Sequence, residues 1–389
     1  MIELALVGDP VLDVVPVEDR AGARVFVDAH IAPLANEFER TATVPETVLD
    51  ALSRAGLWAP FLPTDLGGRG VDMVTLGAIH EEVGRGCSSV RSLLTVHTMV
   101  AWVVNRWGTP DQRHHWVPRL ADGSTLGAFC LTEPGAGSNA ADIATVAEQT
   151  PDGWRLNGTK RWITNGRRAD VFLVFARTGA TIVGFLVPRS TPGLEVSAIT
   201  EVLGTRGSML AEVRLRDVAL PDDALVGPRG FTAGMVLTSA LDLGRFSVAN
   251  GCVGLVQACL DASTSYALER RVGGTALWDL PLIRSKISDM VTDVRAARLL
   301  CTEAGRLKDA GDPATVMATW IAKYFASVAA ARHASEAVQI HGANGFGPDH
   351  PVARLYRDAK VMEVIEGSNE IQRLTIADEA LRGLAGSPS

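Results

Sequence analysis

The sequence predicts an α+β fold built of an N-terminal helical domain, a middle β domain and a C-terminal helical bundle. Apolar residues recur at three- and four-residue spacing as far as about residue 121, which is typical of amphipathic helices. Short runs rich in β-branched residues follow, and long helical patterns resume after Gly230. We therefore expect the domains to comprise residues 1–123, 124–230 and 231–389.

The composition indicates an acidic globular protein that does not bind nucleic acid. Of its 389 residues 47% are hydrophobic and 21% are charged, and the formal net charge is -7 without any basic block. The five cysteines lack metal-site spacing, so we predict buried thiols and no metal. Residues 1–17 lack the basic start of a signal peptide, and no uninterrupted apolar run would span a bilayer. We expect no membrane association and a cytoplasmic location rather than an organelle interior.

Helical patterns account for the first domain. Residues 74–83 and 93–107 each predict a helix, and the second is almost wholly apolar, so we expect it to be buried. Arg91 and His97 are polar exceptions in this region. A core histidine with satisfied ring nitrogens is the simplest interpretation of His97, and a substrate contact is the alternative.

Strand patterns define the second domain. Residues 171–175, 182–187 and 211–216 are short β-rich runs bounded by Gly, Pro or Asp. Because no long helix alternates with them, the sequence argues against a doubly wound nucleotide-binding fold. The Gly-rich segment 129–139 is either a turn between strands or a place where backbone amides approach a ligand.

Long helical patterns return in the third domain. Residues 231–267, 282–310 and 313–340 each predict a helix, and the last of these is rich in Ala and other small residues. Small side chains allow helices to pack closely, so we expect a tight bundle.

Glu366 lies where two further predicted helices meet. Gly367 ends the first helix, and Ser368 and Asn369 are good caps for the second. The apolar residues before Glu366 would raise its carboxyl pKa, whereas the following helix N-terminus would lower it. On this pattern alone Glu366 either caps a helix or is a base poised to take a proton.

Three motifs around this joint resemble the C-terminal signature of the acyl-CoA dehydrogenase family. The resemblance covers nearly the whole chain from about residue 20. It implies the same three-domain architecture, with a β-barrel or β-sandwich as the middle domain and a four-helix bundle as the C-terminal domain. It also implies that Glu366 removes the α-proton of an acyl thioester. Because no protein side chain accepts a hydride, a cofactor is needed, and the resemblance implies FAD. The motifs are Tyr356-Arg357-Asp358-Ala359-Lys360, Glu366-Gly367-Ser368 and Glu370-Ile371-Gln372-Arg373.

The resemblance extends to segments that bind the cofactor. Residues 129–139 and 160–165 resemble the flavin segments of the family, in which small residues admit the flavin and a Trp packs on its ring. Arg270 resembles an arginine that reaches the FAD pyrophosphate of a neighbouring subunit, and residues 339–345 resemble the segment over the adenosine. The implied cofactor-binding residues are Phe129, Leu131, Thr132, Gly137, Ser138, Trp162, Ile163, Thr164, Arg270, Gln339, Gly342, Ser368 and Glu370.

The chain departs from the family pattern after Arg270. The usual Gln-Phe-Gly is Val272-Gly273-Gly274, and the usual downstream glutamines are Pro281 and Arg284. The lost aromatic ring predicts weaker packing on the adenosine, and therefore a lower FAD affinity with unchanged flavin chemistry.

Residues 241–245 match the place where the family contacts the pantetheine arm of the thioester. Asp242 and Arg245 are therefore candidate substrate contacts, although a salt bridge on a helix surface would also explain them. Some branches of the family carry their base at the position of Gly244, so Glu366 is the only matching base here. The implied substrate-binding residues are Ser138, Asp242, Arg245, Gly367, Arg91 and His97.

Residues 86–102 and 248–254 resemble the subgroup that oxidises acyl groups on acyl-carrier protein in polyketide extender-unit biosynthesis of the methoxymalonyl-ACP type. Arg91 and His97 would suit a short polar acyl group there. We therefore expect FAD-dependent oxidation of such an acyl thioester, by desaturation or by alcohol oxidation. The alternatives are an ordinary short- or branched-chain acyl-CoA dehydrogenase, a flavin monooxygenase or oxidase, and a flavin-poor acyl-carrier-binding protein.

The resemblance also implies partners. We expect an acyl thioester on acyl-carrier protein or CoA, and an electron-transfer flavoprotein or another acceptor for the electrons. We further expect a homotetramer or homodimer with FAD near the subunit boundaries.

Overall fold

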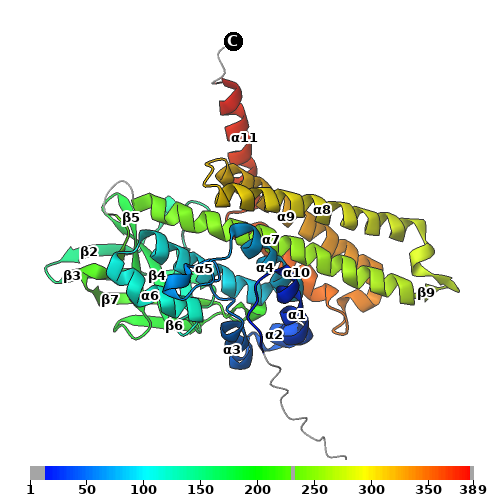
Figure 1. The fold of residues 1–389 in the computed structure, drawn as a ribbon, viewed down its shortest axis with the longest axis horizontal. Helices are drawn as coiled ribbons and strands as arrows, with labels where there is room; N and C mark the ends of the chain where they lie inside the picture. Colours follow the sequence, from blue (N-terminus) through cyan, green and yellow to red (C-terminus); the bar gives the residue numbers. More distant parts are fainter. Residues whose placement is uncertain (1–13, 229–232, 386–389) are drawn as a thin grey trace, which may run out of the picture.

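The computed structural model describes residues 14–228 and 233–385 and has the predicted three-part α+β fold (Figure 1). The β domain lies at one end, and the long C-terminal helices extend to the other. Residues 1–13, the predicted start of the third domain at residues 231 and 232, and residues 386–389 lie outside the described residues.

The N-terminal domain consists of helices, as predicted. The patterns at residues 74–83 and 93–107 correspond to α4 (Met73–Gly86) and to the almost wholly buried α5 (Ser88–Trp107). Asp72 caps α4 by accepting a hydrogen bond from the Thr75 amide. The other helices are α1 (Arg20–His30), α2 (Ala35–Thr41), α3 (Glu46–Arg54) and α6 (Pro110–Asp122).

One twisted sheet forms the middle domain. Its path runs β6-β7-β3-β2-β4-β5-β8, and β1 pairs with β4 in parallel. The first six residues of β4 are buried, which explains why this strand is apolar without alternation. The strands are β1 (Gly127–Cys130), β2 (Val146–Thr150), β3 (Gly153–Ile163), β4 (Val171–Thr178), β5 (Thr181–Pro188), β6 (Leu194–Ala198), β7 (Ala211–Leu220) and β8 (Leu225–Val226).

The C-terminal domain is a helical bundle. Buried alanines along α9 allow it to pack closely on α7. The helix α4 also crosses α7 closely, because a Cβ added at Gly254 would lie 1.9 Å from the Glu81 carbonyl oxygen. The helices are α7 (Ala233–Glu269), α8 (Pro281–Asp309), α9 (Thr315–His341), α10 (Val352–Val364) and α11 (Asn369–Ala385), with short strands β9 (Arg271–Val272) and β10 (Thr275–Ala276) after α7.

The helix α7 is the core helix of the bundle. Residues 234–269 are long and apolar enough to cross a membrane by length and composition, although Asp242, Arg245 and Asp261 interrupt their apolar run. However, 78% of the apolar window is buried inside the protein, as in the central helix of a globular bundle.

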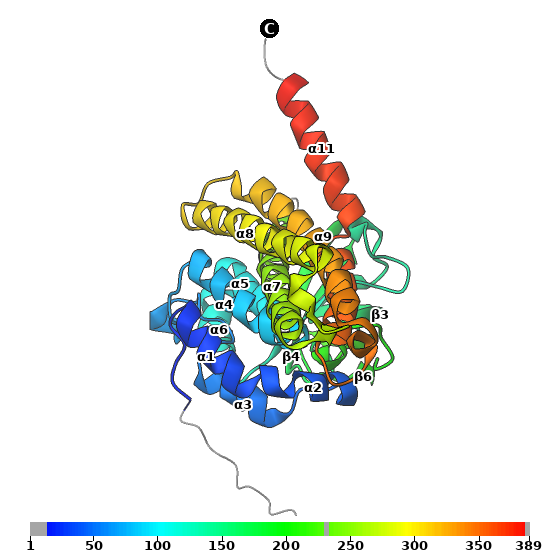
Figure 2. The ribbon, with the colours of Figure 1, turned by 90° about the vertical axis from the view of Figure 1, so that its right-hand side faces the viewer.

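The helix α11 leaves the body of the protein after its first turn (Figure 2). Its start packs beside α9, whereas Leu374 and Leu381 are 62% and 64% exposed. The turn between α10 and α11 therefore lies between packed and projecting segments.

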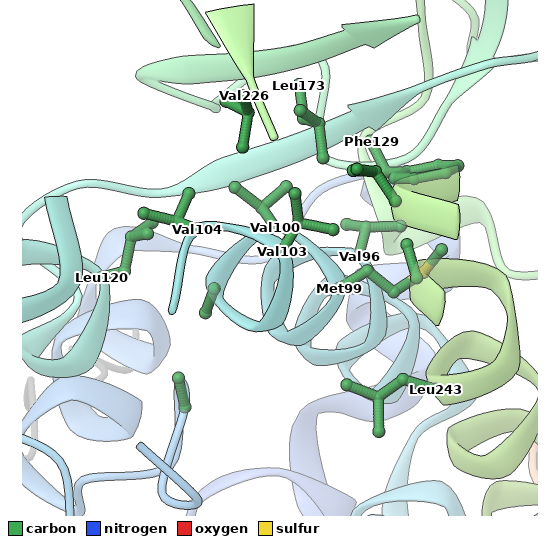
Figure 3. Close-up of a cluster of buried hydrophobic side chains, with 14 of the residues drawn as sticks. Val96, Met99, Val100, Val103, Val104, Leu120, Phe129, Leu173, Val226 and Leu243 are labelled. Carbon is green, nitrogen blue, oxygen red and sulfur yellow. The ribbon is translucent and has the colours of Figure 1, made fainter. Parts of the chain in front are cut away.

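A buried apolar cluster joins the three domains (Figure 3). Val96 and Met99 of α5 lie beneath Phe129 of β1, and Leu243 of α7 lies on the other side of Met99. This cluster connects the sheet to the part of α7 that faces the turn between α10 and α11.

Candidate active site

Glu366 lies in the turn between α10 and α11 with a strained backbone. Its φ is 55°, and that of Gly367 is 89°. A left-handed conformation is uncommon in a residue with a side chain and persists where the surroundings enforce it, often at functional sites. The turn directs α11 outward while the Glu366 carboxyl group lies inside the protein.

The carboxyl group of Glu366 is buried. Its Oε2 atom is covered from solvent and has no hydrogen-bond partner among the described residues. Burial raises the pKa of Glu366 above its ordinary value, and the positive charges of Arg245, Arg91 and Lys323 oppose this rise. A carboxylate with an unused oxygen and a raised pKa is suited to accept a proton from a ligand.

Gly244 and Met99 surround this carboxyl group. A Cβ added at Gly244 would lie 2.4 Å from Glu366 Oε2 and 2.9 Å from Met99 Sδ. Only a glycine on α7 leaves this space, and Met99 links it to the apolar cluster beneath β1.

Arg245 and Asp242 hold different parts of the site. The Arg245 Nε donates to the Glu366 carbonyl at 3.2 Å, and its guanidinium lies 4.1 Å from the Trp320 ring centroid. Asp242 forms an ion pair with Lys308 of α8. The partner of Asp242 is therefore not Arg245, which was the alternative explanation of these two residues. The second oxygen of Asp242 is buried and has no partner among the described residues.

Lys323 of α9 joins the site, although no sequence motif pointed to this residue. Its ammonium donates to the Gly367 carbonyl at 2.9 Å and to Asn369 Oδ1 at 3.2 Å. Ser327 donates to the same Asn369 oxygen at 2.8 Å, and Gln372 donates to the Gly367 carbonyl at 2.9 Å. The only available signal was a lysine within an Ala-rich buried helical stripe.

Arg91 is buried with neutral partners. Its guanidinium donates to Thr95 Oγ1 at 2.9 Å and to Ser92 Oγ at 3.0 Å, and it touches the Met362 sulfur. No ion pair joins it to a carboxylate in residues 14–228 and 233–385. A buried cation without a carboxylate is costly, so this position is a candidate contact for a polar ligand group.

His97 uses both ring nitrogens within the protein. Nε2 lies 2.8 Å from the Leu120 carbonyl oxygen, and Nδ1 accepts from the Gly127 amide at 3.1 Å. Burial lowers its pKa to about 4, so the ring is neutral, and it lies 5.1 Å from the Trp58 ring at an interplanar angle of 56°. No ring nitrogen is left for a substrate, which corrects the expectation of a substrate contact and supports the core-histidine interpretation.

The first predicted flavin segment leads from a buried strand to an open loop. Phe129 and Leu131 are buried, Thr132 is half-buried, and Gly137 and Ser138 are exposed. A Cβ at Gly137 would have no atom within 4 Å, so the loop borders open space.

A buried ion pair anchors this loop. Glu133 accepts from Lys160 Nζ at 2.6 Å, and from the Thr145 and Ala144 amides at 3.0 and 2.6 Å. Lys160 also donates to the Leu131 carbonyl at 3.1 Å. The loop is therefore held from beneath, while its outer face stays open.

The second predicted flavin segment presents an aromatic ring beside this loop. Trp162 is 48% exposed with φ 61°, whereas Ile163 is buried and Thr164 is half-buried. The Arg161 amide donates to the Thr132 carbonyl at 2.8 Å, which joins the two segments. An exposed indole ring held next to an open Gly-rich loop fits a flat aromatic cofactor.

The remaining predicted cofactor residues lie elsewhere. Arg270, Gln339 and Gly342 are exposed at the far end of the bundle, where Tyr266 stacks on His341. Lys323 and His341 are 18 positions apart on α9, which separates them by about 27 Å along the helix, so this group does not share the Glu366 site within one chain. Ser368 and Glu370 flank the start of α11. Hydrogen bonds from the backbone amide of Glu370 itself and from the Ser368 side chain lower the pKa of the exposed Glu370 carboxyl group.

Comparison with known proteins agrees with this geometry. Models of the acyl-CoA dehydrogenase N-terminal, middle and C-terminal domains match residues 18–124, 128–218 and 229–381. The human mitochondrial short-chain specific acyl-CoA dehydrogenase is 36% identical over 92% of this chain and 88% of its own. The solved butyryl-CoA dehydrogenase from Megasphaera elsdenii is 32% identical with a TM-score of 0.89, covering 92% of this chain and 96% of its own. FkbI, for biosynthesis of the methoxymalonyl extender unit of the polyketide Fk520, is 33% identical with a TM-score of 0.86, covering 94% and 99%.

Proposed function

The chain belongs to the acyl-CoA dehydrogenase family, and on this premise we propose that it oxidises a short, polar acyl group carried on acyl-carrier protein. Like its relatives it is an FAD-dependent acyl-thioester dehydrogenase. Thr132, Gly137, Ser138, Trp162 and Thr164 are the residues that would hold the flavin. When bound, the flavin supplies the acceptor for the departing hydride.

The buried, unpartnered carboxyl oxygen of Glu366 is the observation that carries the proposal. In a desaturation Glu366 takes the α-proton of the thioester at Oε2. In an alcohol oxidation it takes the hydroxyl proton of a 2-hydroxyacyl group instead. The hydrogen bond from Arg245 to the Glu366 carbonyl fixes the turn while either proton moves.

The surroundings of Arg91 support the proposal that the acyl group of the substrate is polar. Its buried guanidinium has hydroxyl and thioether partners, so a hydroxyl or other polar group of the substrate would find a donor there. The likeness to FkbI, which is described as serving the biosynthesis of a polyketide extender unit, favours the carrier-protein thioester.

Oxidation of a plain short-chain acyl-CoA is the second candidate. Val96, Met99, Phe129 and Leu243 belong to one buried apolar cluster (Figure 3), and its member Met99 reaches Gly244 next to the Glu366 carboxyl group, so the surroundings suit an unsubstituted acyl chain. The 36% identity to a short-chain specific acyl-CoA dehydrogenase favours the same substrate.

We also propose a homotetramer or homodimer that passes electrons to an electron-transfer flavoprotein or another acceptor. Leu282, Leu299 and Phe346 are more than 70% exposed on the bundle, as expected of a surface that another copy covers. Arg270, Gln339 and Gly342 would then serve the FAD of a neighbouring subunit.

Anaerobic bleaching of the bound flavin tests the function. The substrates to compare are a glyceryl thioester on acyl-carrier protein, the same group on CoA, and butyryl-CoA. Fastest bleaching by the carrier-bound glyceryl group is expected, and preference for butyryl-CoA would establish the second candidate. Failure of all three to bleach the flavin would overturn both, and rapid peroxide release in air would mark an oxidase.

A further inference from the structure

We infer that Lys323 is a positioning residue for the base, because its ammonium holds the Glu366 turn and places a fixed positive charge beside the carboxyl group. The inference rests on the proposed role of Glu366 as base. It concerns a side chain on α9 that no sequence motif identified.

The hydrogen bonds of Lys323 secure the turn at the second of its two strained residues and at the start of the helix that follows. The ammonium binds the carbonyl of Gly367 and the side chain of Asn369, the first residue of α11. Glu366 and Gly367 both have positive φ, a conformation that needs enforcement from the surroundings. Arg245 holds the Glu366 carbonyl from α7, so two cations fix two successive carbonyl groups.

The buried charge of Lys323 is not explained by an ion pair. Its side chain is fully buried, and no carboxylate lies within ion-pair distance among the residues that the structure describes. An apolar side chain would suit this stripe, whose neighbours Ala322 and Ala326 are also buried. Because desolvating an ammonium group opposes folding, the presence of Lys323 at this buried position indicates that its charge has a function.

The charge acts on Glu366. The groups that face Lys323 are Cys252 and Arg245 from α7, Glu363 from α10 and Glu366 itself, and burial lowers the pKa of Lys323 to about 8. Lys323 is therefore mostly protonated near neutral pH.

Glu366 is faced by three cations on three helices. Arg91 lies on α5, Arg245 on α7 and Lys323 on α9, and all three oppose the rise in its pKa that burial causes. Removing the Lys323 charge would leave Glu366 protonated up to a higher pH, and a protonated carboxyl group cannot act as base.

The test compares Lys323→Gln, which keeps a hydrogen-bond donor without charge, with Lys323→Arg, which keeps the charge. The flavin-loaded proteins are reduced anaerobically across their stable pH range with whichever of the three thioesters bleaches the wild-type flavin fastest. Lys323→Gln should slow flavin reduction by about 10- to 100-fold near neutral pH. It should also move the acid limb of the pH–rate profile, where the rate falls as the pH is lowered, to higher pH. Lys323→Arg should keep the wild-type acid limb.

Lys286→Gln is the matched control, because it also removes a lysine charge from the bundle, where Lys286 pairs with Glu336. It should leave the rate and acid limb unchanged. An unshifted acid limb in Lys323→Gln would overturn the inference. If Lys323→Gln does not fold, a shifted limb in Lys323→Arg would overturn it instead.

A second readout does not depend on the substrate. Hydrogen exchange of the amides at residues 367–372 should be faster in Lys323→Gln than in wild type and Lys286→Gln, because the turn loses an anchor. Unchanged exchange would contradict the positioning role even if no tested thioester reduced the flavin. Failure of the wild-type reduction alone would count against the proposed function instead.

Discussion

Gly244 of α7 lies directly against the carboxyl group of Glu366, more than 120 residues later in the chain. A methyl group added at Gly244 would stand 2.4 Å from Oε2 and 2.7 Å from the carboxyl carbon, closer than Cβ atoms approach other atoms. Gly244 has no positive φ, so the requirement for glycine comes from space alone. The Glu366 carboxyl group can therefore occupy its place only because residue 244 has no side chain.

Gly244→Ala should displace this carboxyl group. We expect flavin reduction by substrate to slow by about 10- to 100-fold, because a displacement of about 1 Å is enough for such losses. Bound FAD should be retained, since Gly244 is separate from the flavin loop. Stopped-flow reduction measures the effect, and Gly234→Ala is the control because its added methyl group would meet open space on the same helix. Equal rates in the two variants would contradict the contact.

Glu366→Gln should keep FAD and lose reduction by substrate. The amide cannot take a proton, so a loss of about 100- to 10,000-fold is expected. Burial raises the pKa of Glu366, so the wild-type rate should already fall on the acid side at a pH where exposed glutamates remain ionised. The exposed Glu379 provides the control variant Glu379→Gln. If substrate reduced the flavin of Glu366→Gln at the wild-type rate, Glu366 would not be the base.

The sequence was informative where local pattern decides the structure. The spacing of apolar residues located α4, α5, α7, α8 and α9, and the break at Gly367 located the joint that holds Glu366. The predicted three-domain fold is confirmed, whereas the boundaries at residues 123 and 230 stay predictions.

Long-range partners explain what the sequence could not show. The bond from Lys323 to the Gly367 carbonyl spans 44 residues, and the ion pair of Lys308 with Asp242 spans 66. Neither spacing follows from helical periodicity, which only marks which face of a helix is buried. The role of His97 likewise depends on Gly127, 30 residues away on β1.

His97→Gln should reduce the acid sensitivity of folding without changing substrate preference. Burial lowers the folded-state pKa of His97 from 6.5 to about 4, so the unfolded chain binds the proton more readily. Stability from this group is present above about pH 6.5 and is lost as the pH falls towards 4, by about 2 kcal/mol at about pH 5.

Urea unfolding at about pH 7 and about pH 5 measures this difference. Relative to wild type, His97→Gln should be less stable at the higher pH but lose about 2 kcal/mol less on acidification. His114→Gln, on an exposed histidine, should lose as much as wild type. If His97→Gln changed the order in which the three thioesters reduce the flavin, His97 would have to be a substrate contact after all.

Asp358→Asn should alter the pH dependence in the opposite direction. Burial raises the pKa of Asp358 to about 6, although Arg354, the Thr205 amide and Arg357 favour the charged form. The stability that the raised pKa of Asp358 contributes is present below about pH 3.9, the pKa of this carboxyl group in the unfolded chain. It is lost as the pH rises through 6, by about 3 kcal/mol in total.

The asparagine oxygen can still accept from the Thr205 amide, which Asp358 does at 2.6 Å. The free energy of unfolding of Asp358→Asn minus that of wild type should therefore rise by up to about 3 kcal/mol from about pH 4 to about pH 7.5. Asp378→Asn on the exposed part of α11 should show no such rise. A constant difference for Asp358→Asn would show that the buried carboxyl group keeps an ordinary pKa.

Trp162→Ala should weaken FAD binding more than it affects folding. The indole ring is 48% exposed beside the open Gly137 loop, with the Arg161 guanidinium 5.0 Å from its centroid. An exposed ring contributes little to the core, whereas stacking on a flat aromatic ligand stabilises the complex by about 0.5–1.5 kcal/mol, which corresponds to about 2- to 12-fold in Kd. Titration of the apoprotein with FAD, followed by flavin fluorescence, measures this change.

Two further variants decide whether the ring itself binds the cofactor. Trp162→Phe keeps an aromatic face and should recover most of the affinity, whereas Trp278→Ala removes a similarly exposed indole, 44% accessible after α7, and should leave Kd unchanged. Equal affinity in wild type and Trp162→Ala would remove Trp162 from the flavin site. Equal weakening by Trp162→Ala and Trp278→Ala would instead indicate a general loss of stability, which thermal unfolding of the apoproteins would detect independently.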